Sequence, residues 1–419
     1  MVFSLGNSFQ AVPLDRVIAL DVLLQPLRLN PVAGVGAVVQ YLLTESNHPP
    51  LYCVLVHWWM QVFAPLLNSS VNEGMEGYVS VWAARSLPAL FGAASIPAIY
   101  GLSQLAFRSR LVSQLAAAMM AVSPYAIFLA QEARHYTLAI LWVIASLSCL
   151  VIATRHIYHR TSLPLWLSGT WIGINALGIA THYFFSLSLC AEALVLTGFL
   201  ISGSKVAINP IQIQNLKSLC AVAVGTLIGG LVWLPVFWQN SYNTQLTQWI
   251  QSDEQVGLLA WVSPVFQALA GWIGMLCLLP VEASALPVVI ASGSMMLIFF
   301  IWAVPILNRG IKTQLQQLDS RIATQLFLGV VCSAITIFLI FTYGFGIDLT
   351  RGARYNFVYF PAVIVLVGAS LAACWNSSTP HSSKQTGKAS VVLIWLMGLV
   401  SAITVVCNLG YQKYYRPDL

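Results

Sequence analysis

Long runs of apolar residues, separated by short polar segments, dominate the chain. The first strong run is LYCVLVHWWMQVFAPLL at 51–67, and further runs lie near 77–107, 111–128, 135–154, 164–181, 183–202, 218–237, 259–280, 285–307, 322–343, 354–374 and 389–409. About 20 apolar residues are needed for a helix to cross a bilayer, whereas membrane barrel strands alternate over about ten residues. The pattern therefore predicts an all-α, polytopic membrane helical bundle.

Composition supports this reading. Hydrophobic residues make up 58% of the 419 residues and charged residues only 8%, whereas a soluble domain carries about 25% charge. So few charges could not cover a water-exposed surface. The eight cysteines have no CxxC spacing and lie mostly in apolar runs, so we interpret them as small packing residues.

The basic residues predict a topology. The net charge of +6 comes from short Lys/Arg clusters between apolar runs, which is typical of cytoplasmic loops and argues against a nucleic-acid partner. An even number of crossings must separate the basic loops at 205–217 and 308–321, yet three runs lie there. The run 259–280, interrupted by Pro264, is expected to be an outer-side re-entrant or interfacial helix.

The same reasoning sets the domain boundaries. The run 51–67 is short and contains Trp58 and Trp59, which suit the headgroup region. We expect ten crossings, with both termini on the outer side. The expected parts are an outer-side loop and interfacial helix region at 1–76, a transmembrane domain at 77–409 and an outer-side tail at 410–419.

Ionisable residues collect at the loops that this topology places outside. Such groups at membrane depth are functional hypotheses by default. They lie in five segments: Glu45 to Tyr52, Arg85, Gln131 to Tyr136, Thr181 to Tyr183, and Asp348 to Tyr355. Each has a structural alternative, such as a helix start at His48, a solvated loop at Glu132 and Arg134, or interfacial cations at 351 and 354.

Together these segments predict an outer-side cavity with cations, histidines and one or two carboxylates. Arginine and histidine suit a phosphate-bearing ligand. A carboxylate beside them could take a proton from an acceptor hydroxyl. Because the cavity would open toward the bilayer, a lipid-linked phosphate is the expected ligand.

The same segments resemble the GT-C glycosyltransferases, specifically the bacterial family-39-like members related to protein mannosyltransferases and lipid A aminoarabinose transferases. The matching stretches are HPPLYCVLVHWWMQVF at 48–63, AARSLPALFGAASIPAIYGLSQLAF at 83–107, AVSPYAIFLAQEARHYTLAILWV at 121–143, THYFF at 181–185 and RGARYNFVYFPAVIVLV at 351–367. The resemblance implies inverting transfer of a hexosyl or pentosyl group from a polyprenyl-phosphate sugar to an unknown acceptor, on the outer face of the bacterial plasma membrane.

The resemblance also implies roles for residues. Arg134, Arg351 and Arg354 would bind the donor phosphate, and His48 and Arg85 would lie around it. The full donor-binding set is His48, Arg85, Arg134, Tyr136, His182, Arg351, Arg354 and Tyr355. No cofactor or metal is expected, although the wider superfamily includes members that use a divalent metal.

One departure concerns the base. The family carries an acidic Asp-Glu motif in a first outer loop that follows a first helix, and residues 1–47 look like the later part of that loop. The candidate catalytic carboxylates are Glu132, Glu45, Asp15 and Asp21. We therefore expect an N-terminally truncated or catalytically impaired relative that binds donor but transfers slowly. A lipid or sugar transporter is the alternative from another class, although no internal repeat supports it.

Overall fold

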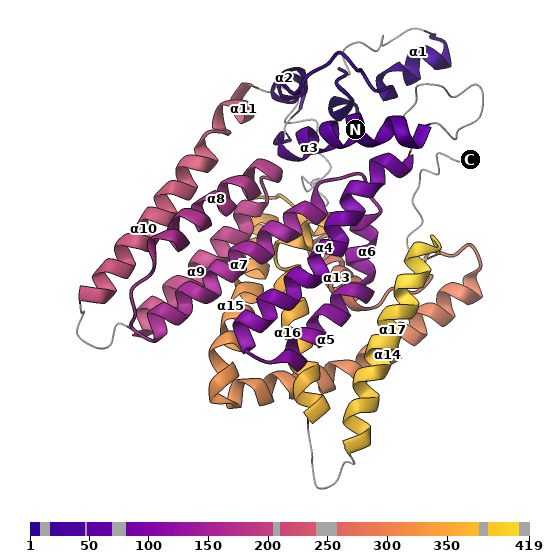
Figure 1. Ribbon diagram of the computed structural model, residues 1–419. Helices are drawn as coiled ribbons and strands as arrows, with labels where there is room; N and C mark the ends of the chain where they lie inside the picture. The colour runs from indigo at the N-terminus through magenta and orange to yellow at the C-terminus, as the bar shows by residue number, and fades with distance from the viewer. Residues whose placement is uncertain are drawn as a thin grey trace.

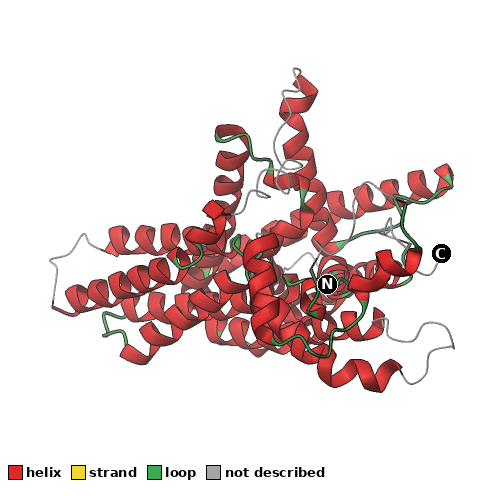
Figure 2. Cartoon of the chain, turned by 90° about the horizontal axis from the view of Figure 1, so that it is seen from above, coloured by secondary structure: helices red, strands yellow, loops and turns green. Residues whose placement is uncertain are grey.

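A computed structural model describes residues 1–8, 17–46, 48–68, 81–203, 210–239, 258–376 and 384–409. All regular secondary structure in these ranges is helical. The view from above in Figure 2 shows helices joined by loops. The main helices are α1 (Leu20–Leu24), α2 (Val35–Glu45), α3 (Leu51–Asn68), α4 (Val81–Phe107), α5 (Arg110–Val122), α6 (Pro124–Ala130), α7 (Tyr136–Tyr158), α8 (Leu165–Thr181), α9 (Phe185–Gly203), α10 (Pro210–Leu231), α11 (Leu234–Gln239), α13 (Leu258–Leu276), α14 (Leu286–Gln316), α15 (Leu318–Leu339), α16 (Phe360–Asn376) and α17 (Lys384–Val406). The predicted all-α fold class is confirmed.

The centre of the bundle is α16, whose side chains from Phe360 to Cys374 are nearly all buried. It packs on α5 and α14, while α4 packs on α5 and α7. At one edge α10 lies along α8 (Figure 1) and exposes Val224, Leu227 and Ile228. An apolar outer surface of this kind is expected where lipid replaces water as the solvent.

Six helices of the described chain are long and apolar enough to cross a membrane, and seven if the bent pair α5–α6 counts as one span. They begin at Val81, Tyr136, Pro210, Leu286, Leu318 and Gly387. Four further apolar helices, including α13 and α16, are shorter. The polytopic membrane character is thus confirmed, while the count of ten crossings stays a prediction.

The predicted run 111–128 does not form one straight helix. It breaks into α5 and α6, which meet at 56°. Ser123 adopts an extended conformation between them, and Pro124, which lacks an amide hydrogen, starts the second helix. The Ser123 hydroxyl donates to the Met275 carbonyl of α13 at 2.7 Å, so the break carries a tertiary contact.

Helices α1, α2 and α3 lie across one end of the bundle (Figure 1). In α3, His57 is fully buried and its Nδ1 lies 2.9 Å from the carbonyl of Ser4. Trp59 donates to Ser86 of α4 at 2.8 Å. This arrangement fits the expected interfacial region, whose boundaries stay predictions. The expected tail at 410–419 lies outside the described residues.

A buried polar network joins four helices. The Ser146 hydroxyl of α7 lies 2.7 Å from Glu192 Oε2 of α9 and accepts from Trp171 Nε1 of α8 at 3.1 Å. Asn175 of α8 donates to Thr226 of α10 at 2.8 Å. The residues proposed from the sequence do not include Glu192, although it is an acid within the apolar run 183–202.

Gly368 sets the distance between α16 and α5. A Cβ at this position would lie 2.7 Å from the backbone Cα and N of Ala116. We expect Gly368→Ala to lower the free energy of unfolding by about 1–3 kcal/mol through overpacking, seen as a lower unfolding temperature in detergent. Gly101→Ala in α4 is the matched control, since a Cβ there meets nothing within 4 Å. Equal unfolding temperatures for the two variants would contradict the proposed close packing.

Candidate functional site

Three histidines from three separate segments meet at the end of the bundle beneath α3. His135 immediately precedes α7, and its ring centroid lies 4.6 Å from that of His182, which ends α8. The ring of His48, before α3, lies 5.7 Å from His135. His135 is only 8% exposed. The fold thus brings together two predicted residues, His48 and His182, around a histidine that sequence analysis did not select.

Aromatic side chains enclose this cluster. Tyr136 lies 4.7 Å from His135 between ring centroids, and Tyr52 lies 5.9 Å from it. Tyr355 and Phe357 of the 3-10 helix η7 (Ala353–Val358) face His182 at 6.1 and 5.0 Å. The predicted residues Tyr136 and Tyr355 are therefore part of the cluster.

Two arginines supply positive charge. The guanidinium of Arg354 lies 5.7 Å from the ring centroid of Tyr355, and Tyr125 of α6 donates to the Arg354 carbonyl at 2.9 Å. The charges of Arg134 and Arg354 both act on His48 and His135. Arg134 is exposed and Arg354 is half-buried.

The electrostatics oppose protonation of the histidines. Burial, followed by the charges of His182, His48, Arg134 and Arg354, holds the pKa of His135 well below its usual range. Burial, followed by the charges of His48 and Arg354, lowers the pKa of His182 to about 3. His48 is an exposed residue, yet the loss of water around its ring and then the charge of Arg134 lower its pKa to about 4.

Glu132 provides a carboxylate in the same loop. It lies two positions before Arg134, and its carbonyl accepts from the Arg134 amide at 2.7 Å. Its Oε2 atom is buried and has no hydrogen-bond partner among the described residues. Because an unpaired buried carboxylate oxygen is costly, this atom is a natural place for a hydroxyl-bearing ligand.

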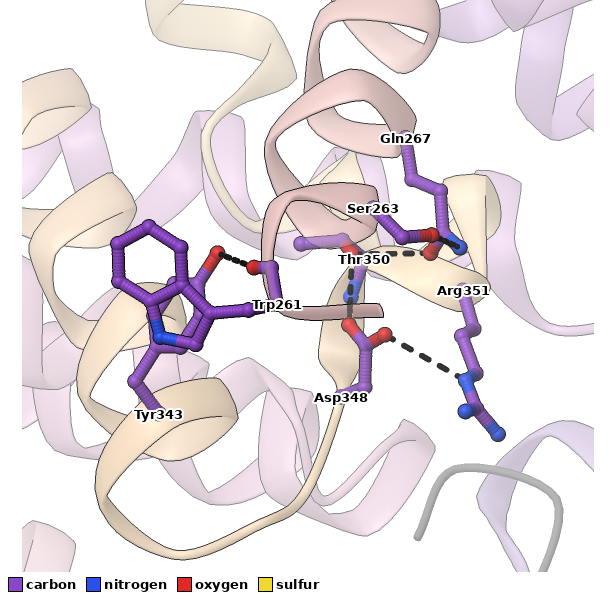
Figure 3. Close-up of polar contacts among 7 residues, drawn as sticks. All are labelled: Trp261, Ser263, Gln267, Tyr343, Asp348, Thr350 and Arg351. Atoms are coloured by element: carbon purple, nitrogen blue, oxygen red, sulfur yellow. Dashed lines mark hydrogen bonds and ion pairs between the residues drawn. The ribbon is translucent and has the colours of Figure 1, made fainter. Parts of the chain in front are cut away.

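Arg351 contacts an acidic side chain of its own segment. Its Nε atom is 3.4 Å from Oδ2 of Asp348 (Figure 3). Asp348 is buried, and its Oδ1 accepts from the amide of Thr350, whose hydroxyl also lies 3.1 Å from Gln267 of α13. Figure 3 shows these contacts tying the segment to α13. The charge of Arg351 is thus partly balanced within the chain, and its predicted contact with donor phosphate stays a prediction.

Helix α13, which covers most of the run 259–280, packs beside the segment that carries Arg351 and Arg354. It contacts η6 (Leu349–Arg351), η7 and α6, and Tyr343 donates to the Trp261 carbonyl at 2.8 Å. Trp272 donates to Tyr359 at 2.7 Å. The side of the membrane on which α13 lies stays a prediction.

Four further candidates were predicted: Glu45, Asp21, Asp15 and Arg85. Glu45, at the end of α2, accepts from the Ser8 hydroxyl at 2.6 Å. Asp21 is exposed on α1, and Asp15 lies outside the described residues. Arg85 is half-buried near the start of α4. Their catalytic and binding roles stay predictions.

Within the ranges that the structure describes, no group of three or more His, Cys, Asp or Glu side chains is arranged to hold a metal ion. The three histidines meet through ring contacts and not as a ligand set. The expectation of a site without metal or cofactor stays a prediction.

Residues 36–197 match the family model described as dolichyl-phosphate-mannose-protein mannosyltransferase. The resemblance to GT-C membrane glycosyltransferases is confirmed. The matched segment contains His48, Glu132, Arg134, His135 and His182, but ends before Arg351 and Arg354.

Solved structures of an archaeal oligosaccharyltransferase from Archaeoglobus fulgidus are also similar. One is AglB in complex with an inhibitory peptide and a dolichol-phosphate, at 12% identity and a TM-score of 0.46, covering 87% of this chain and 48% of that one. Its apo form is 12% identical with a TM-score of 0.45 and the same coverage. The chain thus spans about half the length of these proteins. No curated protein sequence matches it significantly.

Proposed function

We propose that this chain is an integral membrane glycosyltransferase that takes its sugar from a polyprenyl-phosphate donor. The observation that carries the proposal is the cluster of Arg134 and Arg354 with three histidines at one end of an apolar helical bundle. Arginine binds phosphate oxygens through paired, charge-assisted hydrogen bonds. The lipid chain of the donor would remain between apolar helices while its phosphate reaches this end.

In the proposed reaction, the acceptor hydroxyl attacks the anomeric carbon as the bond to the donor phosphate breaks. The arginines stabilise the negative charge on the departing phosphate. Glu132 takes the hydroxyl proton. Its Oε2 atom is buried and has no hydrogen-bond partner among the described residues, so it is available to accept that proton. Attack from the face opposite the phosphate inverts the anomeric configuration.

We place the active face on the outer side of the bacterial plasma membrane, following the positions of the basic loops. Membrane lipid surrounds the bundle and no nucleic acid takes part. The family match over residues 36–197 supports the lipid-phosphate donor.

The test uses the full chain in lipid nanodiscs with a panel of polyprenyl-phosphate hexoses and pentoses. We expect saturable binding of at least one donor and competition by polyprenyl phosphate without sugar. Release of the sugar to an added acceptor or to water would confirm transferase chemistry. Binding without any release supports the impaired relative. Movement of intact donor between leaflets without cleavage would instead support the transporter.

A further inference from the structure

His135 combines burial with an unused hydrogen-bonding atom. The residue is 8% exposed, and its Nε2 has no hydrogen-bond partner in the part of the chain that the structure describes. Its ring lies between those of His48 and His182. Buried polar atoms are usually satisfied, so this nitrogen points to a ligand that supplies the missing partner.

Positive charge predominates among the groups that act on His135. The rings of Tyr52, His48, Tyr136 and His182 contact His135, and Tyr355 contacts His182. The charges of Arg134 and Arg354 act on His135, and the N-terminal ammonium acts on His48. Glu132, in the loop before His135, is the nearest acid along the chain. Protonation of any of the three imidazoles therefore adds positive charge to a positive site.

A bound lipid phosphodiester weakens this repulsion. Its single negative charge offsets one of the two guanidinium charges and stabilises an imidazolium beside it. We propose that the imidazole pair His135 and His182 takes up a proton when a lipid phosphate binds between Arg134 and Arg354, so that donor binding and proton uptake are coupled. This rests on the proposed function, which supplies the phosphate. The proton comes from solvent and no covalent bond changes.

The direction of the pH dependence follows from linkage. The pKa of each histidine is low without the anion and rises when the anion binds. Affinity is then highest at low pH. It falls as pH rises from the pKa of the histidine without the anion to its higher pKa with the anion bound. One coupled proton gives at most about a tenfold loss of affinity per pH unit.

The experiment measures binding of a polyprenyl methyl phosphodiester to the full chain in nanodiscs between pH 4.5 and 7. This probe carries one negative charge throughout, so any pH dependence belongs to the protein. We expect the dissociation constant to rise about threefold to tenfold per pH unit over part of this range. Calorimetry in two buffers of different ionisation enthalpy should show net proton uptake on binding.

The variants separate this inference from the proposed function. His135→Gln keeps a hydrogen-bonding side chain that does not titrate, and should flatten the pH profile; His182→Gln serves if that variant does not fold. His156→Gln is the control, because His156 lies at the far end of α7 and contacts Thr161. Binding with a change below about twofold over the whole range and no proton uptake would overturn the inference while leaving the donor site intact. Failure to bind at every pH would count against the proposed function itself.

Discussion

Glu132→Gln is expected to lower the rate of sugar transfer by about 10²–10⁴-fold, because a positioned base contributes about that much. Donor binding should change little, since the amide keeps the size of the side chain and removes only its ability to accept a proton. The measurement is single-turnover transfer at saturating donor, together with the dissociation constant of the donor. A loss confined to the rate would assign the base.

The N-terminal acids give the matched controls for Glu132. Glu45→Gln replaces the carboxylate that accepts from the Ser8 hydroxyl by a neutral amide, and Asp21→Asn changes an exposed residue. We expect transfer within about threefold of the unmodified chain for both, as for exposed or locally paired groups in general. If instead one of these variants, or Asp15→Asn, abolishes transfer while Glu132→Gln does not, the base lies in the N-terminal region, as in the expectation from the family.

Arg354→Gln is expected to weaken donor binding by about 10- to 100-fold. The reason is loss of a charge-assisted hydrogen bond to phosphate, about 1.5–3 kcal/mol. Tyr125 fixes the backbone at this position through the Arg354 carbonyl, so the variant should keep its place in the fold. The measurement is the dissociation constant for polyprenyl phosphate in nanodiscs.

Arg351→Gln is the comparison for Arg354, three positions away in the same segment. Asp348 contacts the guanidinium of Arg351 at 3.4 Å, so the charge of Arg351 is partly balanced within the chain. We therefore expect binding within about threefold of the unmodified chain. An equal loss for both variants would show that both arginines bind the phosphate, as the sequence resemblance implies.

Sequence reasoning proposed several residues that the structure brings together, because ionisable residues are rare in this chain. His48, Arg134 and His182 lie in separate loops between apolar runs, and the cost of burying charge in lipid made each a candidate. The family match spans all three positions, and their roles stay predictions. His135 was passed over because it adjoins Arg134 and Tyr136, and nothing in its local pattern distinguishes a central residue from a neighbour.

What the sequence by itself determined is the solvent of the protein and the class of its fold. Continuous apolar runs and a charge content of 8% require helices in a bilayer. The bend at Ser123, the pairing of Arg351 with Asp348 and the position of His135 between two other histidines were decided only by the tertiary structure. The physical reason is that periodicity and composition report the burial of each segment separately. Which side chains meet depends on how distant helices pack, with Ala116 against Gly368 as one such contact.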